Sequence, residues 1–300
     1  MGEGCLSSGC ISNHDFSSDI NRAGTASLKY DGRKNMFGTP EVIPLWVADM
    51  DFAAPPAVVR ALAERAAHPV YGYTIYPDSL YETLIDWLKR RHGWAVQREW
   101  IVMCPGVVPS LHAAVMAFAG PGERVIVQPP VYYPFFSAVT RTGRHLTYNP
   151  LRLGNRRYSI DFDHLEQCAV GARLLLLCSP HNPVGRVWSK QELEYILGIA
   201  RKHDLVILSD EIHADLVYPG NKHLTLSMLA GTLVESMPNI VTAVAPSKTF
   251  NIPGLNLSAL IVPDPECRSA LIQAFEAMHV SASNPFSIVA FEAAYREGEA

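Results

Sequence analysis

The chain has 300 residues, of which 48% are hydrophobic and 18% are charged, and its formal net charge is −4. The apolar fraction is enough for one large or two smaller domains, and a charged fraction below the usual ~25% favours a large buried core or subunit interface. The 25 basic and 29 acidic residues form no long run of either sign, which argues against a nucleic acid or an anionic membrane as partner.

The cysteine and histidine patterns give no sign of a disulfide framework or a metal site. The 6 cysteines are scattered without a C-x-x-C pair, which is typical of free thiols in a reducing cytosol. The 11 histidines show no H-E-x-x-H or similar ligand spacing, so we expect no metal site. Residues 1–13 lack the basic and apolar regions of a secretory signal, and no apolar run approaches the ~20 residues of a membrane span. We therefore expect a cytoplasmic protein.

Apolar residues at helical spacing predict two helices in the first half of the chain. One covers Ser79–Arg91 and opens with a capping box, in which Ser79 is followed three residues later by Glu82. The other covers Val107–Phe118 and starts directly after a proline and a glycine. The short apolar run Arg124–Val127 then predicts a strand.

Four short apolar runs in the second half predict strands that are buried on both faces. They cover residues 173–178, 205–208, 240–245 and 257–262. A second capping box, Ser189 with Glu192, predicts a helix between the first two runs. The alternation of short apolar runs with longer amphipathic ones predicts an α/β fold, with a mostly parallel central sheet sandwiched by helices.

Polar side chains follow three of these strands directly. Asn182 comes after the first, Asp210 after the second and Lys248 after the third. Because ligands of open α/β sheets bind outside the carboxyl ends of the strands, the three side chains should meet at one rim. Singly, each has a plain structural explanation, as a turn residue, a cap and a surface lysine. Together they match pyridoxal phosphate (PLP), which requires an amine for its aldehyde, a carboxylate for its pyridine nitrogen and a donor to O3′.

Three stretches at these strand ends resemble the class I/II aminotransferase superfamily, whose members have the fold type I architecture of PLP-dependent enzymes. They are Ser179–Gly185 (SPHNPVG), Ser209–Val217 (SDEIHADLV) and Ala245–Leu255 (APSKTFNIPGL). Further stretches resemble its MalY/PatB branch, the cystathionine β-lyases and cysteine-conjugate C–S lyases. They are Trp46–Phe52 (WVADMDF), Tyr71–Tyr73 (YGY) and Pro129–Phe136 (PPVYYPFF).

The resemblance implies roles for five residues around the cofactor ring. Lys248 would form the Schiff base with PLP and move the substrate Cα proton, and Asp210 would pair with the pyridine nitrogen. Asn182 would bind O3′, and Tyr132 would stack on the ring face. His213 stands where many aminotransferases carry a tyrosine directed at O3′. Because the lyase branch tolerates histidine there, this residue favours a lyase.

The phosphate of the cofactor would be held by four further residues. The backbone N–H groups of Val107 and Val108, at a helix start, and the side chain of Ser247 would bind it from within the chain. Tyr73 would reach the phosphate of the neighbouring subunit. The resemblance therefore implies a homodimer with shared active sites.

The activity that the resemblance implies is a PLP-dependent C–S β-lyase, a carbon–sulfur lyase of the cystathionine β-lyase type. It would cleave a sulfur-containing amino acid to a thiol, pyruvate and ammonia. Two alternatives stay open. One is a PLP-dependent aminotransferase, which would use the same residues but protonate the carbanion at the cofactor carbon. The other is a non-catalytic or regulatory PLP-binding protein.

On the same basis the chain divides into four parts. Residues 1–30 are an irregular N-terminal segment, 31–70 belong to a small domain and the entry to the active site, 71–262 form the large PLP-binding domain, and 263–300 begin the C-terminal part. Related chains continue beyond this point to an arginine that clamps the substrate α-carboxylate. Arg268 and Arg296 lie in no such motif. We therefore expect a truncated chain, with a partial small domain and weak binding of amino acid substrates.

Overall fold

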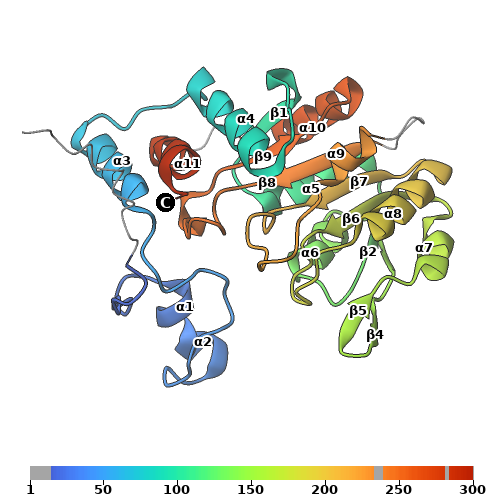
Figure 1. The fold of residues 1–300 in the computed structure, drawn as a ribbon, viewed down its shortest axis with the longest axis horizontal. Coiled ribbons are helices and arrows are strands. Elements are labelled where there is room, and N and C mark those ends of the chain that lie inside the picture. The colour runs from blue at the N-terminus through green and yellow to red at the C-terminus, as the bar shows by residue number, and fades with distance from the viewer. Residues whose placement is uncertain (1–14, 233–238, 281–283, 300) are drawn as a thin grey trace, which may run out of the picture.

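The computed structural model of the chain describes residues 15–232, 239–280 and 284–299, and is built around a seven-stranded sheet (Figure 1). The strands lie in the order β1 (Ile101–Cys104), β9 (Ser258–Ile261), β8 (Ile240–Val244), β7 (Val206–Asp210), β6 (Ala172–Cys178), β2 (Arg124–Val127) and β3 (His145–Tyr148). From β3 to β8 neighbouring strands are parallel, whereas β9 is antiparallel to both β8 and β1. The predicted α/β fold with a mostly parallel sheet is confirmed.

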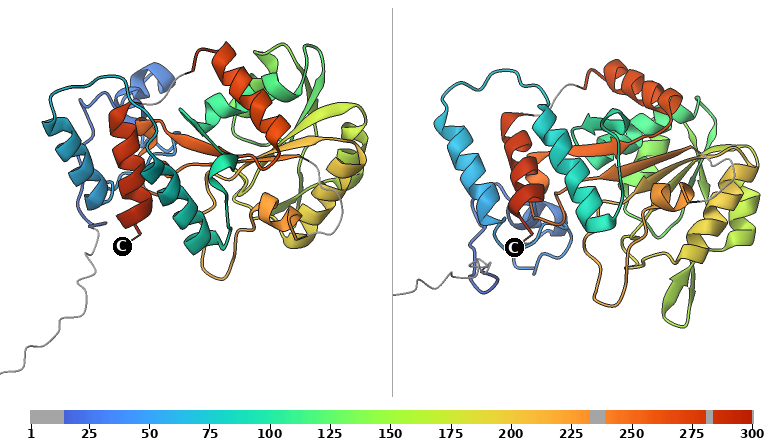
Figure 2. Two further views of the ribbon diagram at one scale, coloured as in Figure 1. Left: turned by 90° about the horizontal axis from the view of Figure 1, so that it is seen from above. Right: turned by 45° about the horizontal axis from the view of Figure 1, so that its top comes forward.

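Helices cover both faces of this sheet (Figures 1 and 2). One face packs against α5 (Val107–Phe118), α6 (Pro134–Thr140) and α10 (Pro265–Ala277). The other packs against α7 (Phe162–Ala169), α8 (Lys190–Lys202) and α9 (Leu226–Ala230). A third apolar cluster joins β1 and β9 to α3 (Pro56–Ala67), α4 (Asp78–His92) and α11 (Pro285–Glu297). No helix in the described ranges is long and apolar enough to cross a membrane.

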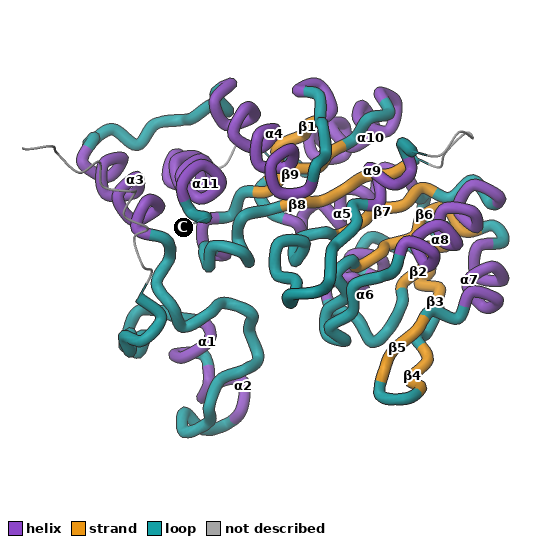
Figure 3. Tube along the Cα trace, viewed as in Figure 1, coloured by secondary structure: helices purple, strands orange, loops and turns teal. Residues whose placement is uncertain are grey.

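Shorter elements complete the described structure (Figure 3). They are α1 (Leu28–Asp31), α2 (Arg33–Phe37), the 3-10 helices η1 (Arg98–Trp100) and η2 (Pro253–Leu255), and the hairpin of β4 (Arg152–Gly154) and β5 (Arg157–Ser159). The hairpin stands apart from the main sheet, with which it shares no strand pairing.

One of the two predicted capping boxes is confirmed and the other is wrong. Ser189 Oγ accepts from the Glu192 backbone N–H, and the Glu192 carboxylate accepts from the Ser189 N–H, at the start of α8. In contrast, α4 begins one residue before Ser79, whose hydroxyl donates instead to Glu292 of α11 at 2.6 Å. The Ser79 hydroxyl therefore contacts a helix that is distant in sequence instead of capping α4, and no local sequence pattern reveals such a contact.

The strand boundaries shift slightly from the predicted ones, and one shift matters for function. The strand predicted over residues 205–208 extends to Asp210, because Asp210 pairs with Cys178 of β6 and Ala243 of β8. Asp210 is therefore the last residue of a central strand rather than part of a loop. Its backbone is fixed on both sides by neighbouring strands.

The N-terminal segment, residues 15–55, lies beside the sheet and is attached to the loop after β8 by Asn251 (Figure 1). Asn251 Oδ1 accepts from the Met50 N–H at 2.8 Å, and its Nδ2 donates to the Met50 and Phe52 carbonyls at 3.0 and 2.7 Å. Asn251 adopts a left-handed backbone conformation, φ +53°, which asparagine tolerates better than most residues. The segment is thus held by side-chain-to-backbone hydrogen bonds close to Lys248.

Candidate active site

The carboxyl ends of the parallel strands bring Asp210 and Lys248 to one rim of the sheet. Asp210 ends β7, and Lys248 lies in a tight turn after the neighbouring strand β8. Hydrogen bonds from the Phe250 N–H to the Pro246 carbonyl and from the Ile252 N–H to the Ser247 carbonyl, both 3.0 Å, close this turn. The turn folds Lys248 back near the strand end, where its charge and that of Asp210 influence each other.

The Asp210 carboxyl group is buried and has no cationic partner in direct contact among the described residues. Burial raises its pKa from 3.8 to about 7. The Ile212 N–H, which donates to the carboxylate at 3.2 Å, partly offsets this by lowering the pKa. The negative charge of Glu211 raises the pKa further, and Lys248 lowers it. Near neutral pH such a carboxyl group is therefore poised between its neutral and charged forms, and a cation placed against it would favour the charged form.

Burial changes the pKa of the Lys248 amine in the direction opposite to that of the Asp210 carboxyl group. Burial lowers its pKa, while the negative charges of Asp49 and Asp210 raise it. His213 lies close enough for Lys248 to act on it, and burial together with that charge lowers the pKa of His213 to about 4. His213 Nε2 is buried and has no hydrogen-bond partner among the described residues, so the imidazole offers a polar atom to a ligand.

Tyr132 and Asn182 are brought together from different parts of the chain. The Tyr132 N–H donates to the Asn182 carbonyl at 3.1 Å. The pKa of Tyr132 is raised mainly by burial, and also by Tyr133 and by the charge of Asp210. The effect of Asp210 indicates that the Tyr132 ring lies near the Asp210 end of the site. Its ring also contacts that of Tyr133, with centroids 5.0 Å apart.

The start of α5 is the helix end at which the sequence predicts binding of the cofactor phosphate. Val107 and Val108 are the first two residues of this helix, and no side chain caps it. Gly106, directly before them, has φ +154°, which residues with a Cβ rarely adopt. The N–H groups at this end are therefore free to bind an anion such as a phosphate.

Three residues weighed in the sequence analysis lie away from this cluster. Tyr73 is fully exposed, in the loop between α3 and α4. Arg268 donates to the Val262 and Pro263 carbonyls at 2.7 and 3.1 Å, and Arg296 donates to Thr83 Oγ1 at 3.1 Å. Both arginines therefore serve contacts inside the fold.

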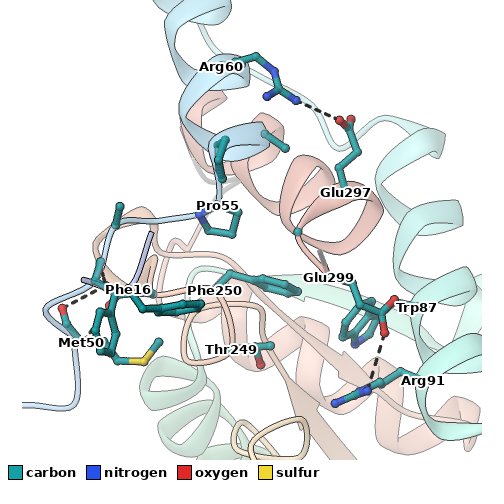
Figure 4. A pocket seen from close by; sticks show the side chains of 16 residues that line it. Phe16, Met50, Pro55, Arg60, Trp87, Arg91, Thr249, Phe250, Glu297 and Glu299 are labelled. Atoms are coloured by element: carbon teal, nitrogen blue, oxygen red, sulfur yellow. Dashed lines mark hydrogen bonds and ion pairs between the residues drawn. The ribbon is translucent and has the colours of Figure 1, made fainter. Parts of the chain in front are cut away.

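A pocket of about 440 Å³ lies beside the Lys248 turn but does not include Lys248 (Figure 4). Thr249, Phe250 and Asn251 contribute its wall nearest the turn, and the remaining walls come from the N-terminal segment and from α3, α4 and α11. Ion pairs of Arg60 with Glu297, at 3.4 Å, and of Arg91 with Glu299, at 3.8 Å, lie at its edge. The pocket adjoins the site rather than forming its centre.

The sequence analysis missed the contribution of the N-terminal segment to this site. Asp49 lies in the stretch WVADMDF, yet nothing in that stretch indicates that its charge acts on Lys248. Asp49 is paired with Arg22, which also donates to Asp51 at 2.7 Å, while Lys29 donates to Asp51 at 2.9 Å. Among the described residues, the partly buried Arg22 and the buried Lys29 pair with these two acids, whereas Lys248 lies about 200 positions further along the chain.

The raised pKa of Asp210 predicts a pH effect on the cofactor-free protein. Between about pH 4 and pH 7 the folded protein keeps a proton on Asp210 that the unfolded chain has released. Folding therefore binds a proton, and the contribution of this group to stability is lost as pH rises through that window. Relative to the parent, Asp210→Asn should gain about 3 kcal/mol between pH 4.5 and 7.5, at about 1.36 kcal/mol per pKa unit. Thermal unfolding of both proteins measures this, and a difference that stays constant with pH would contradict the assignment.

Comparisons with known proteins agree on one family. A model of the family described as aminotransferase class I and II matches residues 40–297. Cystathionine beta-lyase PatB of Bacillus subtilis is 42% identical over 286 residues, which is 95% of this chain and 73% of PatB.

Solved structures of PLP-bound proteins also resemble this chain in fold. A PLP-bound putative aminotransferase from Clostridium difficile superposes with a TM-score of 0.92 at 38% identity, over 96% of this chain and 74% of the other. A PLP-bound C–S lyase from Staphylococcus hominis gives 0.87 at 32% identity, over 96% of this chain and 72% of the other.

Proposed function

The chain belongs to the family of class I and II aminotransferases, and from this premise we propose that it is a PLP-dependent C–S β-lyase acting on a sulfur-containing amino acid. The observation that carries this proposal is the buried Asp210 carboxyl group beside the half-buried Lys248 amine, at the ends of neighbouring strands. The likeness to proteins named as cystathionine β-lyase and C–S lyase supports the lyase reaction.

The described residues fit PLP on two independent grounds. Burial raises the pKa of the Asp210 carboxyl group, so its charged form lacks a compensating charge. A protonated pyridine nitrogen placed against it would supply that positive charge. His213 Nε2 is a buried polar atom without a partner in the described structure, and a ring hydroxyl oxygen would provide one. When bound, PLP supplies an electron sink for the electrons released from the substrate Cα–H bond.

Lys248 is proposed as the residue that holds the cofactor and moves the proton. To accept a proton from the substrate Cα, the amine must be neutral, and burial lowers its pKa in that direction. With the cofactor bound, the sulfur substituent would leave Cβ as a thiolate together with the C–S electron pair. Lys248 would then regain the cofactor, and hydrolysis of the remaining amino acid fragment would give pyruvate and ammonia. Asp210 would hold the pyridine nitrogen throughout.

Asn182, Tyr132 and His213 are proposed to orient the ring. Asn182 and His213 would bind O3′, and Tyr132 would cover one ring face. The hydrogen bond from the Tyr132 N–H to the Asn182 carbonyl links the two loops that carry these residues. Because a shift of one loop would displace the other, the two side chains would be positioned together. Val107, Val108 and Ser247 would hold the phosphate within the chain.

A product assay on one preparation distinguishes the lyase from an aminotransferase, the class of enzyme for which the Clostridium difficile protein is named. With cystathionine alone, a lyase releases homocysteine, pyruvate and ammonia in equal amounts. An aminotransferase instead requires a 2-oxo acid and converts 2-oxoglutarate to glutamate. Release of thiol without an added 2-oxo acid supports the proposal. Turnover that depends wholly on 2-oxoglutarate would replace it by the aminotransferase reaction.

We further propose that the site is shared between two subunits of a homodimer. Tyr73 is fully exposed, and its loop also exposes Val70, Tyr71 and Ile75, an apolar set that a second subunit would cover. We propose in addition that residues 71–262 form the large cofactor-binding domain, and that residues 31–70 and 263–300 belong with the small domain.

Tyr73→Phe tests this arrangement, since it removes only the hydroxyl. If that hydroxyl binds the phosphate of the neighbouring subunit, its loss weakens PLP binding by about 1.5–3 kcal/mol, the value of a hydrogen bond to a charged group. The PLP dissociation constant of the variant measures this. Tyr195→Phe, at an exposed tyrosine on α8, is the matched control. A monomer by light scattering that binds PLP as tightly as the parent would refute the shared site.

A further inference from the structure

A buried carboxylate lies directly after Asp210 and is fully engaged in hydrogen bonds. Glu211 Oε2 accepts from His223 Nε2 at 2.7 Å. Its Oε1 accepts from Ser209 Oγ at 2.9 Å and from the Leu226 N–H at 3.0 Å. Both oxygens are thus occupied, so this second acid is held away from the ligand that Asp210 would bind.

A second carboxylate–histidine pair, His92 with Asp215, lies between the Glu211–His223 pair and the turn that carries Lys248. The His223 ring contacts the His92 ring edge to face, with centroids 6.1 Å apart and planes at 87°. His92 Nε2 donates to Asp215 Oδ1 at 2.8 Å. Asp215 Oδ2 accepts from the hydroxyl of Thr249 at 2.8 Å, and Thr249 directly follows Lys248 in the chain.

We call Glu211, His223, His92 and Asp215 the carboxylate–histidine bridge. Its first member adjoins Asp210 in sequence, and its last member bonds the neighbour of Lys248. The side chains of Glu211 and His223 are 1% and 2% exposed, and those of Asp215 and His92 are 8% and 11% exposed. Burying such groups costs free energy that apolar side chains of similar size would not cost. Stability alone therefore does not account for them.

We propose that the carboxylate–histidine bridge is a positioning device, which fixes the separation of the Asp210 carboxylate and the Lys248 amine so that both engage one cofactor ring. The inference rests on the proposed function. Asp210 is anchored in a strand, whereas Lys248 is carried by a turn, so the turn is the part that needs a second anchor. The bridge reaches that turn through Thr249 and adds the end of α4, through His92, as a rigid support.

Thr249→Val is the mildest test, because it replaces the hydroxyl by a methyl group of similar volume. It removes one hydrogen bond to a buried carboxylate and should weaken PLP binding about tenfold, slightly less than a direct bond to a charged group contributes. The pH midpoint of the bound-cofactor absorbance, which reports on the Lys248 amine, should also move. Thr249→Ser keeps the hydroxyl and should restore both values. His92→Gln should act in the same direction.

His203→Gln is the matched control, at a third carboxylate–histidine pair far from the site. His203 Nε2 bonds Glu166 Oε1 at 3.0 Å, between α8 and α7, and neither residue belongs to the bridge. Its loss should affect thermal stability of the cofactor-free protein without changing PLP affinity or the absorbance midpoint.

A double-variant cycle of Glu211→Gln with Thr249→Val tests the connection itself. The two side chains share no hydrogen bond in the described structure, so independent sites would give additive losses of PLP affinity. Coupling of at least about threefold supports the bridge. The inference is overturned if the bridge variants lower only the thermal stability, as the control does, and keep the PLP affinity and absorbance midpoint of the parent. A parent protein that binds no PLP would overturn the proposed function, and this inference with it.

Discussion

Lys248→Ala is expected to lower C–S lyase turnover by at least about 10³-fold, since it removes the only group proposed to move the Cα proton, and general base catalysis is typically worth 10²–10⁴-fold. The variant also loses the amine that would hold the cofactor covalently. Steady-state release of pyruvate from cystathionine measures the first effect. Borohydride reduction of the parent, followed by peptide mass mapping, should place the pyridoxyl group on the peptide that contains Lys248.

The fold should survive this substitution, because Lys248 lies in a turn that backbone hydrogen bonds close. Lys190→Ala, at an exposed position at the start of α8, is the matched control and should keep parental turnover. Attachment of the pyridoxyl group to another lysine, or a Lys248→Ala variant that retains turnover, would exclude this residue as the cofactor lysine.

Asp210→Asn is expected to lower turnover by about 10²- to 5 × 10³-fold, while the protein still folds. A neutral amide cannot hold a protonated pyridine nitrogen, and breaking a buried ion pair by removing one partner costs ~3–5 kcal/mol. At about 1.36 kcal/mol for each factor of ten, this corresponds to the stated loss. Cofactor affinity should fall as well, since the pair contributes to binding.

The matched control for this change is Asp86→Asn, which removes an exposed carboxylate on α4 that pairs with Arg90 at 2.6 Å. An exposed pair of this kind contributes little, so the control should differ by less than about 1 kcal/mol in stability and not at all in turnover. If Asp210→Asn turns over cystathionine within about threefold of the parent, or ~0.7 kcal/mol in barrier, the proposed role of Asp210 is wrong.

The sequence predicted the sheet and its rim because both depend on local patterns. Buried parallel strands are continuous apolar runs, and the polar residues after them must gather at one edge. These two patterns are enough to place Asp210 and Lys248 at the same edge of the sheet from the sequence alone. The helix Val107–Phe118 and the strand Arg124–Val127 were predicted with the boundaries that the structure has.

What could not be predicted depends on contacts between distant parts of the chain. Ser79 fits a capping box by spacing, but Glu292 of α11 engages its hydroxyl, and no local pattern reports that helix. The antiparallel placement of β9 between β1 and β8 follows from the path of the chain rather than from the apolar run itself. The bond between His92 and Asp215 also joins residues from separate elements, and neither lies in a motif that indicates the other.

The attachment of the N-terminal segment by Asn251 has a consequence for how the chain is made. Met50 and its partner are 201 positions apart, so during synthesis the partner follows at least about 10 s later, at roughly 5–20 residues per second. Until then Ile43 and Leu45, which stay exposed even in the folded protein, have no neighbouring structure to limit access to them. We therefore expect this segment to stay sensitive to proteases until Asn251 has been made, although it is the first described part of the chain to leave the ribosome.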